Sequence, residues 1–192
     1  MHTPTRAALV RGSTVDPARR FADRYRGSAH WDEFRSLLDP AARQLFEQPV
    51  KRSAWYDLVA YAKLLDAACQ CFAPEQSDAL MQDLGKYVVD DGVNTLYRAF
   101  FAIASPSFVL KGSALLWGMF FRGNKLKVID RGRKFAHVAI VNSTFCALPL
   151  CRSIAGGMRS TLGHAGAIDP QLEEHRCISQ GAQRCDFRWR WR

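Results

Sequence analysis

The closing segment of the chain constrains the fold most, because its apolar and charged side chains alternate. The apolar set is Cys185, Phe187, Trp189 and Trp191, and the set between them is Asp186, Arg188, Arg190 and Arg192. A period of two places one set on each face of a β-strand. The segment therefore predicts a strand with one buried face, and its arginines do not require a tail that binds nucleic acid or membrane.

A turn around Gly181 predicts that this strand pairs with the residues before it. If residue 179 faces residue 183, the same register places Cys177 opposite Cys185, with Cβ atoms about 4.5 to 5.5 Å apart. Two facing thiols suit small core residues, and they also suit one half of a metal site. A tetrahedral metal needs further ligands. Cys151 in the preceding helix is one candidate, and Glu174 or His175 is another.

The pattern along the chain predicts an α+β domain, in which an N-terminal helical layer packs on a C-terminal antiparallel sheet. The expected order is helices first and then β-β-α-β-β. Helices are expected at 17–26, 30–38, 40–47, 53–73, 75–104, 107–122 and 147–162, with caps at Asp16, Asp39 and Ser53. Strands are expected at 125–130, 134–142, 174–179 and 183–192. Residues 1–14 are expected to be loosely ordered, and residues 15–192 to form a single domain.

Charge and hydropathy narrow the classes of function. The net charge of +9 is concentrated at the two ends of the chain, where it fits exposed strand faces, so nucleic acid is an unlikely partner. No run reaches the roughly 20 apolar residues of a membrane span, and no signal peptide is recognised, which predicts a cytoplasmic protein without a transmembrane segment. In that compartment the six cysteines are expected to be reduced.

No catalytic residues are predicted, because the chain lacks the G-x-S-x-G, P-loop, H-E-x-x-H and dinucleotide-binding patterns. The apolar segment 107–122 predicts a helix buried on all sides. Beside it, a set of mostly aromatic side chains predicts a ligand pocket: Tyr97, Phe101, Trp117, Phe121, Phe135 and His137. A filled core, with His137 as a satisfied core histidine, is the alternative interpretation.

The motifs of the C-terminal half resemble those of a known family. Cys151, Gly156-Gly157, Glu174-x-x-Cys177, Gly181 and Cys185-x-Phe187 resemble the 4-vinyl reductase domain. Its superfamily includes the sensor domains of aromatic-responsive bacterial activators and subunits of the Golgi transport particle. The helical half resembles an uncharacterised myxobacterial family through Ser53-Ala-Trp-Tyr, Asn94-x-x-Tyr97 and Pro106.

This resemblance implies a structural zinc bound by Cys151, Glu174, Cys177 and Cys185. It also implies a non-enzymatic sensor or binding domain for a small aromatic molecule, an acyl chain or a similar apolar ligand, acting as a homodimer or through a protein partner. Two alternatives remain open. One is a ligand-free dimeric scaffold of the same fold, and the other is an enzyme or carrier that acts on a tetrapyrrole.

Overall fold

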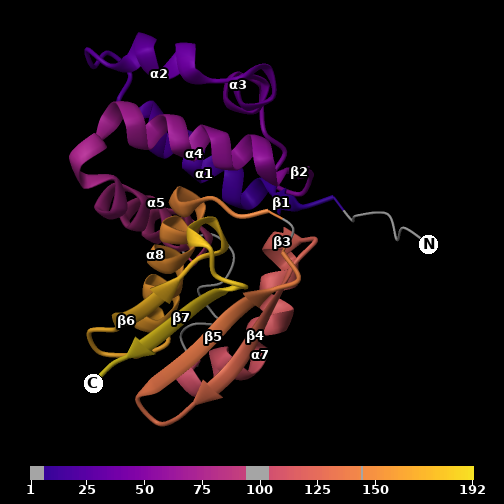
Figure 1. The fold of residues 1–192 in the computed structure, drawn as a ribbon, viewed down its shortest axis with the longest axis vertical. Helices are drawn as coiled ribbons and strands as arrows, with labels where there is room; N and C mark the ends of the chain where they lie inside the picture. The colour runs from indigo at the N-terminus through magenta and orange to yellow at the C-terminus, as the bar shows by residue number, and fades with distance from the viewer. Residues whose placement is uncertain (1–6, 94–103, 144) are drawn as a thin grey trace.

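The computed structural model describes residues 7–93, 104–143 and 145–192, and it confirms a mixture of helices and antiparallel sheets (Figure 1). The first half contains α1 (Gly12–Asp23), α2 (Trp31–Leu37), α3 (Pro40–Glu47), α4 (Leu58–Phe72) and α5 (Ser77–Gly92). The second half contains α7 (Pro106–Phe120), β3 (Phe121–Arg122), β4 (Lys125–Arg131), β5 (Phe135–Val141), α8 (Leu148–His164), β6 (Gln171–Arg176) and β7 (Cys185–Arg190). The order is more mixed than expected, because β1 (Leu9–Arg11) and β2 (Trp55–Asp57) lie among the N-terminal helices.

The strands form two antiparallel sheets. The small sheet has the order β2-β1-β3 and joins the N-terminal segment to the end of α7. The larger sheet has the order β4-β5-β7-β6, so β5 and β7 join its two hairpins. Figure 1 shows α2 and α3 at one end of the molecule and the larger sheet at the other, with α7 behind β4.

Regular secondary structure begins earlier in the chain than expected. Residues 9–11 already form β1, and α1 begins at Gly12 rather than at Pro17, while residues 1–6 lie outside the described residues. A Cβ atom on Gly12 would lie 2.1 Å from the carbonyl oxygen of Lys51, so the start of α1 is a position that suits glycine. The predicted start at Asp16-Pro17 is therefore wrong, and Pro17 is buried inside the helix.

Aspartate side chains cap the N-termini of two other helices. Asp39 accepts a hydrogen bond from the backbone N–H of Ala42 at 2.8 Å, which confirms the predicted cap of α3. At α4 the cap is Asp57, which accepts from the N–H of Ala60 at 2.8 Å. The prediction of Ser53 as the cap is wrong, because β2 occupies the residues that follow it.

Glycines bring α5 and α8 close together. A Cβ atom on Gly156 would lie 2.0 Å from the carbonyl oxygen of Gln82, which confirms that Gly156-Gly157 permits a close backbone approach. Gly85 lies opposite, inside α5. The helix expected over 75–104 is described as the 3₁₀ turn η1 (Pro74–Gln76) followed by α5, and its predicted part over 94–103 lies outside the described residues.

The register of the closing hairpin is confirmed in β6 and β7. Arg176 pairs with Asp186 and His175 with Phe187, as the predicted numbering requires. Cys185, Phe187 and Trp189 are buried, whereas Arg188 and Arg190 are exposed. Pairing does not extend to residues 179 and 183, because the 3₁₀ turn η3 (Ile178–Gln180) and Gly181, with φ of 88°, form the connection.

The prediction that the helix over 107–122 is buried on all sides is wrong. In α7, Val109, Leu110 and Trp117 are buried, but Leu115 is 77% exposed and Phe108 is 54% exposed. Among the described elements, α7 packs mainly against β4, with smaller contacts to β1 and β3. Within the described ranges, no helix combines the length and the hydropathy that a bilayer span requires.

Candidate functional site

A cavity of about 790 Å³ lies between the helical layer and the larger sheet. Residues on or near α5, α7, β4, β5, α8 and β7 form most of its wall, and the apolar ones include Val88, Val89, Val93, Val109, Leu110, Leu116, Trp117, Leu126, Ala136, Val138, Leu150, Ile154, Met158, Leu162 and Trp189. Its volume falls within the range of small-molecule pockets, which is about 300 to 1,000 Å³. The close approach of α5 to α8 places Gly85 and Gly157 in the same wall.

Two of the predicted pocket residues lie in this wall. Trp117 and Phe121 line the cavity, and their rings stack with centroids 4.3 Å apart. The Nε1 of Trp117 donates to Oδ1 of Asn124 at 2.7 Å, which fixes the orientation of the indole ring. Two other predicted residues, Tyr97 and Phe101, lie outside the described residues.

Phe135 and His137 lie away from the cavity. Both belong to β5, in which Ala136 and Val138 face the cavity, so the period of two points Phe135 and His137 to the opposite face. Phe135 is 36% exposed. The Nε2 of His137 lies 2.6 Å from Oδ1 of Asp186 on β7, which gives this histidine a structural partner.

Tyr61 of α4 is a polar lining residue that the sequence analysis did not select. Its side chain is buried, and its hydroxyl lies close to the side chain of Ser153 but meets the geometry of a hydrogen bond with no described residue. Burial raises the pKa of this phenol far above its usual value, with Ser153 opposing the shift. The hydroxyl therefore stays protonated at neutral pH and can donate a hydrogen bond to a group in the cavity.

The small sheet adds a cationic end to the cavity. Arg11 of β1, Trp55 of β2 and Arg122 of β3 line it together. The guanidinium carbons of Arg11 and Arg122 lie 4.9 and 4.0 Å from the centroid of the Trp55 ring. Neither arginine forms an ion pair with any residue that the structure describes. These cations are therefore available to an anionic group.

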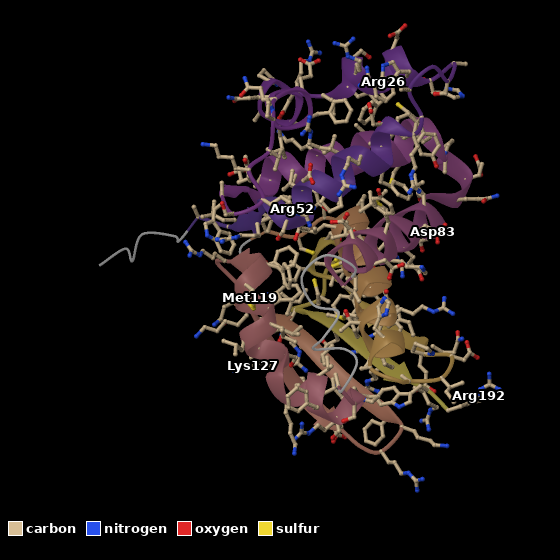
Figure 2. All side chains as sticks on the ribbon, turned by 180° about the vertical axis from the view of Figure 1, so that it is seen from behind. Arg26, Arg52, Asp83, Met119, Lys127 and Arg192 are labelled. Carbon is tan, nitrogen blue, oxygen red and sulfur yellow. The ribbon has the colours of Figure 1, made fainter. Side chains whose placement is uncertain are left out.

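Arg52 also lines the cavity, but carboxylates already neutralise it. Its guanidinium donates to Asp91 at 2.7 Å and to Asp16 at 3.4 Å. Figure 2 shows the region of Arg52 next to α7, which carries Met119. None of these arginines was singled out from the sequence, because Arg11 and Arg122 lie on strands of only two or three residues and Arg52 lies in a turn.

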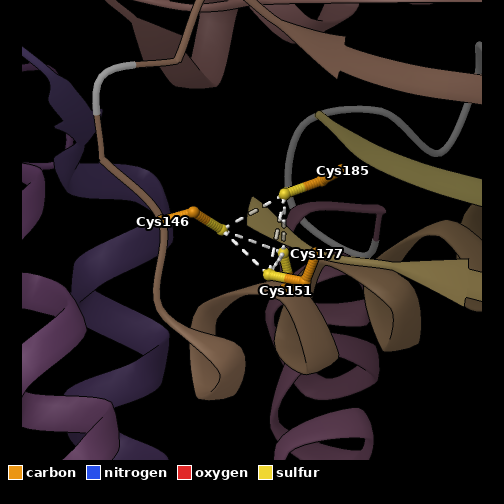
Figure 3. Close-up of side chains that lie close together, drawn as sticks. All are labelled: Cys146, Cys151, Cys177 and Cys185. Atoms are coloured by element: carbon orange, nitrogen blue, oxygen red, sulfur yellow. Dashed lines mark hydrogen bonds between the residues drawn. The ribbon is translucent and has the colours of Figure 1, made fainter. Parts of the chain in front are cut away.

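A second cluster lies where α8 meets the closing hairpin. Four sulfur atoms lie within 4.8 Å of one another, and they belong to Cys146, Cys151, Cys177 and Cys185 (Figure 3). The six Sγ–Sγ distances range from 3.0 Å, between Cys146 and Cys151, to 3.7 Å, between Cys177 and Cys185. This four-cysteine cluster brings together the three cysteines that the sequence analysis selected and adds Cys146.

Hydrogen bonds between the thiols of the four-cysteine cluster shift their pKa values in opposite directions. Hydrogen bonds from Cys146, Cys151 and Cys185 strongly lower the pKa of Cys177. The same network, together with burial, strongly raises the pKa of Cys151.

The sequence analysis also named Glu174 and His175 as candidate ligands. Glu174 is part of β6 and pairs with Arg188, and its side chain is not among those described. The ring of His175 packs against that of Phe187 in a tilted arrangement, with centroids 4.9 Å apart. Cys69 and Cys71 are buried in α4, where burial raises the pKa of Cys69 to about 12. Cys146 was missed because it lies in a loop, although its spacing of five residues from Cys151 was visible.

Comparison with solved structures identifies the fold. The chain is similar to an Fe(II) unliganded H-NOX protein from K. algicida, with 10% identity, a TM-score of 0.68 and coverage of 95% of this chain and 96% of that one. An H-NOX protein from S. oneidensis in the Fe(II)NO state matches with 10% identity, a TM-score of 0.68 and coverage of 95% and 99%. A structure described as probing haem distortion in the H-NOX family matches with 11% identity, a TM-score of 0.65 and coverage of 95% of both chains. No protein-family model and no curated protein matches the sequence.

These matches correct two predictions. The resemblance to the 4-vinyl reductase superfamily is wrong as a family assignment, because the solved structures reported above, which match 95% of the chain, are H-NOX proteins. The zinc cofactor that the resemblance implied is corrected with it, since the related structures are described with Fe(II) and haem. At these identities the matches establish the fold alone.

Proposed function

We propose that this chain is a small-molecule binding domain of a sensor, and that its cavity holds one apolar molecule that carries a carboxylate. The observation that supports this most directly is the 790 Å³ cavity with Arg11 and Arg122 at one end. The apolar wall suits a hydrocarbon chain or ring system, whose burial is worth roughly 25 cal/mol per Å². The guanidinium groups suit a carboxylate, which they can bind through charge-assisted hydrogen bonds.

Tyr61 provides a second point of recognition. Its buried hydroxyl is close to Ser153 but forms no well-formed hydrogen bond with a described residue, and an unpaired buried polar group costs about 1 to 3 kcal/mol. A ligand with a hydrogen-bond acceptor near Tyr61 would remove this cost. The proposed ligand is therefore an amphipathic carboxylate with an acceptor along its apolar body.

Haem is the ligand that the related H-NOX structures suggest first, so its fit to this cavity matters. Haem iron is bound in proteins by His, Cys, Met or Tyr side chains. The described lining residues include Tyr61, Met119 and Met158 but no His or Cys, and the sequence of residues 94–103 contains neither. His137 and His164 pair with Asp186 and Asp90, away from the cavity. The described lining therefore does not fit a haem ligated by histidine or cysteine.

Ligand titration followed by tryptophan fluorescence tests the proposed function. Trp55, Trp117 and Trp189 all line the cavity, so a ligand that enters it will change their emission. A long-chain carboxylic acid is expected to bind at one molecule per chain, and its methyl ester is expected to bind at least about tenfold more weakly, a difference of about 1.4 kcal/mol. Equal affinity for the two would overturn the role of the arginines.

Paired variants locate the carboxylate. Arg11→Gln with Arg122→Gln is expected to reduce binding of the acid to the level of the ester. Arg131→Gln with Arg133→Gln, at the exposed end of β4 and in the turn that follows it, changes the net charge equally and is expected to leave binding unchanged. A haem titration is the parallel measurement, and one haem bound per chain would replace the carboxylate as the assigned ligand.

The sensor part of the proposal is supported by the two faces of α7. One face lines the cavity through Val109, Leu110 and Trp117, while Leu115 and Phe108 are exposed on the surface. A ligand that fills the cavity would thus press on a helix whose other side can contact a partner, either a second copy of the chain or another protein. Light scattering with and without ligand tests this, and a mass that stays monomeric in both states would contradict the homodimer.

A further inference from the structure

We propose that a polar pocket among the N-terminal helices binds a small molecule through a phosphoryl group. The pocket has a volume of about 330 Å³, near the lower end of the range for small-molecule sites. It shares no lining residue with the ligand cavity. Figure 2 shows Arg26, one of its residues, at the end of the molecule opposite to Arg192. The wall comes from α1, α2, α3 and the loop between α1 and α2, and its guanidinium groups are those of Arg19, Arg20, Arg26 and Arg35.

Arg19 of α1 gives the pocket a positive charge without a matching carboxylate. Its Nε donates to the carbonyl oxygen of Phe46 at 2.6 Å, which caps the last turn of α3. The partly buried guanidinium forms no ion pair with any residue that the structure describes. A guanidinium group has five N–H donors, and this cap uses only one nitrogen. The terminal nitrogens of Arg19 are therefore available to an anion in the pocket.

Arg26 and Arg35 are held in place by carboxylates of the same wall. Arg26 donates to Oδ1 of Asp23 from Nε at 2.9 Å and from a terminal nitrogen at 2.6 Å. Arg35 donates to Glu47 at 2.8 Å through one terminal nitrogen. Both ion pairs leave N–H groups over, and they orient the guanidinium groups before a ligand arrives. Less side-chain entropy is then lost when an anion binds.

The number of donors favours a phosphoryl group over a carboxylate. One guanidinium fork satisfies both oxygens of a carboxylate. Here four guanidinium groups and two carboxylates share one wall, which leaves a net charge of +2. Arg20 is balanced by Asp91 and Asp16 outside the wall, so the excess is greatest at Arg19. A phosphate ester carries about −1.5 to −2 charges at pH 7 and three acceptor oxygens, which suit several arginines at once.

Trp31 and Phe46 supply the apolar part of the wall. Their rings meet edge to face with centroids 5.7 Å apart, and Trp31 is partly exposed. The guanidinium carbon of Arg26 lies 5.3 Å from the centroid of the Trp31 ring, so a cation and an aromatic surface lie side by side. An organic phosphate can contact both, with its phosphoryl group at the arginines and its organic group at Trp31.

The test is isothermal titration calorimetry of the full-length chain with phenyl phosphate, inorganic phosphate and benzoate as probes. It is run on the parent and on Arg11→Gln with Arg122→Gln, which removes the cationic end of the ligand cavity and so separates this pocket from the proposed function. In this double variant one phenyl phosphate is expected per chain, bound at least about tenfold more tightly than benzoate and more weakly as salt is added. Tighter binding of phenyl phosphate than of inorganic phosphate assigns an organic phosphate, and equal binding assigns the free ion. Benzoate bound as tightly as phenyl phosphate, or no binding by a chain that unfolds cooperatively, would overturn the proposal.

Variants locate the phosphoryl group. Arg19→Gln is expected to weaken binding at least about tenfold. Because Arg19 also caps α3, Arg26→Gln is the second variant; its side chain is 67% exposed, so the chain should stay folded, and binding should again weaken. Arg24→Gln, at the C-terminal cap of α1 and outside the pocket wall, changes the net charge equally and is expected to bind as the parent does. Unchanged binding in either pocket variant that folds, or an equal loss in Arg24→Gln, would overturn the assignment.

Discussion

Gly85 of α5 and Ser153 of α8 meet backbone to backbone. A Cβ atom on Gly85 would lie 1.8 Å from the carbonyl oxygen of Ser153, a distance at which atoms cannot coexist. Gly85→Ala should therefore force the two helices apart and lower the free energy of unfolding by at least about 3 kcal/mol, as severe overpacking does. Urea denaturation measures this change.

Gly163 provides the matched control on α8. A Cβ atom there would meet nothing within 4 Å, and its backbone is helical. Gly163→Ala should leave the protein as stable or raise the free energy of unfolding by up to about 1 kcal/mol, because alanine favours the helix. If Gly85→Ala were as stable as Gly163→Ala, the close contact between α5 and α8 would be wrong.

The helices and strands could be predicted where local patterns decide them. Alternation in residues 185–191 and the cap at Asp39 act over a few residues, so both were recognised correctly. The start of α1 was missed because Gly12 fits against Lys51, a contact that only the folded chain creates. The exposure of one side of α7 was missed for a similar reason, because the sequence of a helix does not show how many other elements pack against that helix.

A substitution inside the cavity tests its connection to ligand binding. Ser113 of α7 is buried and lines the cavity, and its hydroxyl donates to the carbonyl of Leu110 in its own helix. Ser113→Trp should occupy the ligand volume and weaken binding at least about tenfold, or about 1.4 kcal/mol. Displacement of a fluorescent fatty acid measures the affinity.

Ala114→Trp adds the same side chain one position along, where α7 is exposed and does not line the cavity. Its ligand affinity should equal that of the parent. Melting temperatures of the two variants should be similar, because a cavity accepts a large side chain without the strain of a packed core. A large drop in melting temperature for Ser113→Trp, without one for Ala114→Trp, would show that the core is filled at this position.

The site was less predictable than the fold, because tertiary contacts assemble it. Cys177 and Cys185 were paired from the hairpin register, and Cys151 followed from its helix. Cys146 lies in a loop, for which no periodicity applies. Arg11 and Arg122 come from strands of two or three residues that are too short to recognise, although together they form the cationic end of the cavity.

The arginines at the end of the chain should contribute little to stability or to nucleic-acid binding. Arg190 donates to Glu173 at 2.6 Å and Arg192 to Asp169 at 3.3 Å, but all four side chains are largely exposed. Exposed ion pairs contribute about 0 to 1 kcal/mol each. The double variant Arg190→Gln with Arg192→Gln should therefore lose at most about 1 kcal/mol of unfolding free energy for each ion pair removed. Salt-sensitive DNA binding that disappears in the double variant would contradict this view.

Asp91 should make the stability of the protein depend on pH in the acid range. Burial alone would raise the pKa of this carboxyl, but hydrogen bonds from Arg20 and Arg52 outweigh it, and the pKa is lowered. The unfolded chain then takes up a proton at Asp91 at a higher pH than the folded chain does, so stability falls as the pH decreases below about 4.

Asp91→Asn should lower the free energy of unfolding at pH 7 by about 1 to 2 kcal/mol, because the carboxylate is mostly buried and its partners are partly exposed. Its difference from the parent should shrink between pH 5 and pH 2 in urea titrations. Asp83→Asn, at an exposed position of the same helix, should follow the parent throughout, and a constant difference for Asp91→Asn across this range would contradict the ion-pair explanation.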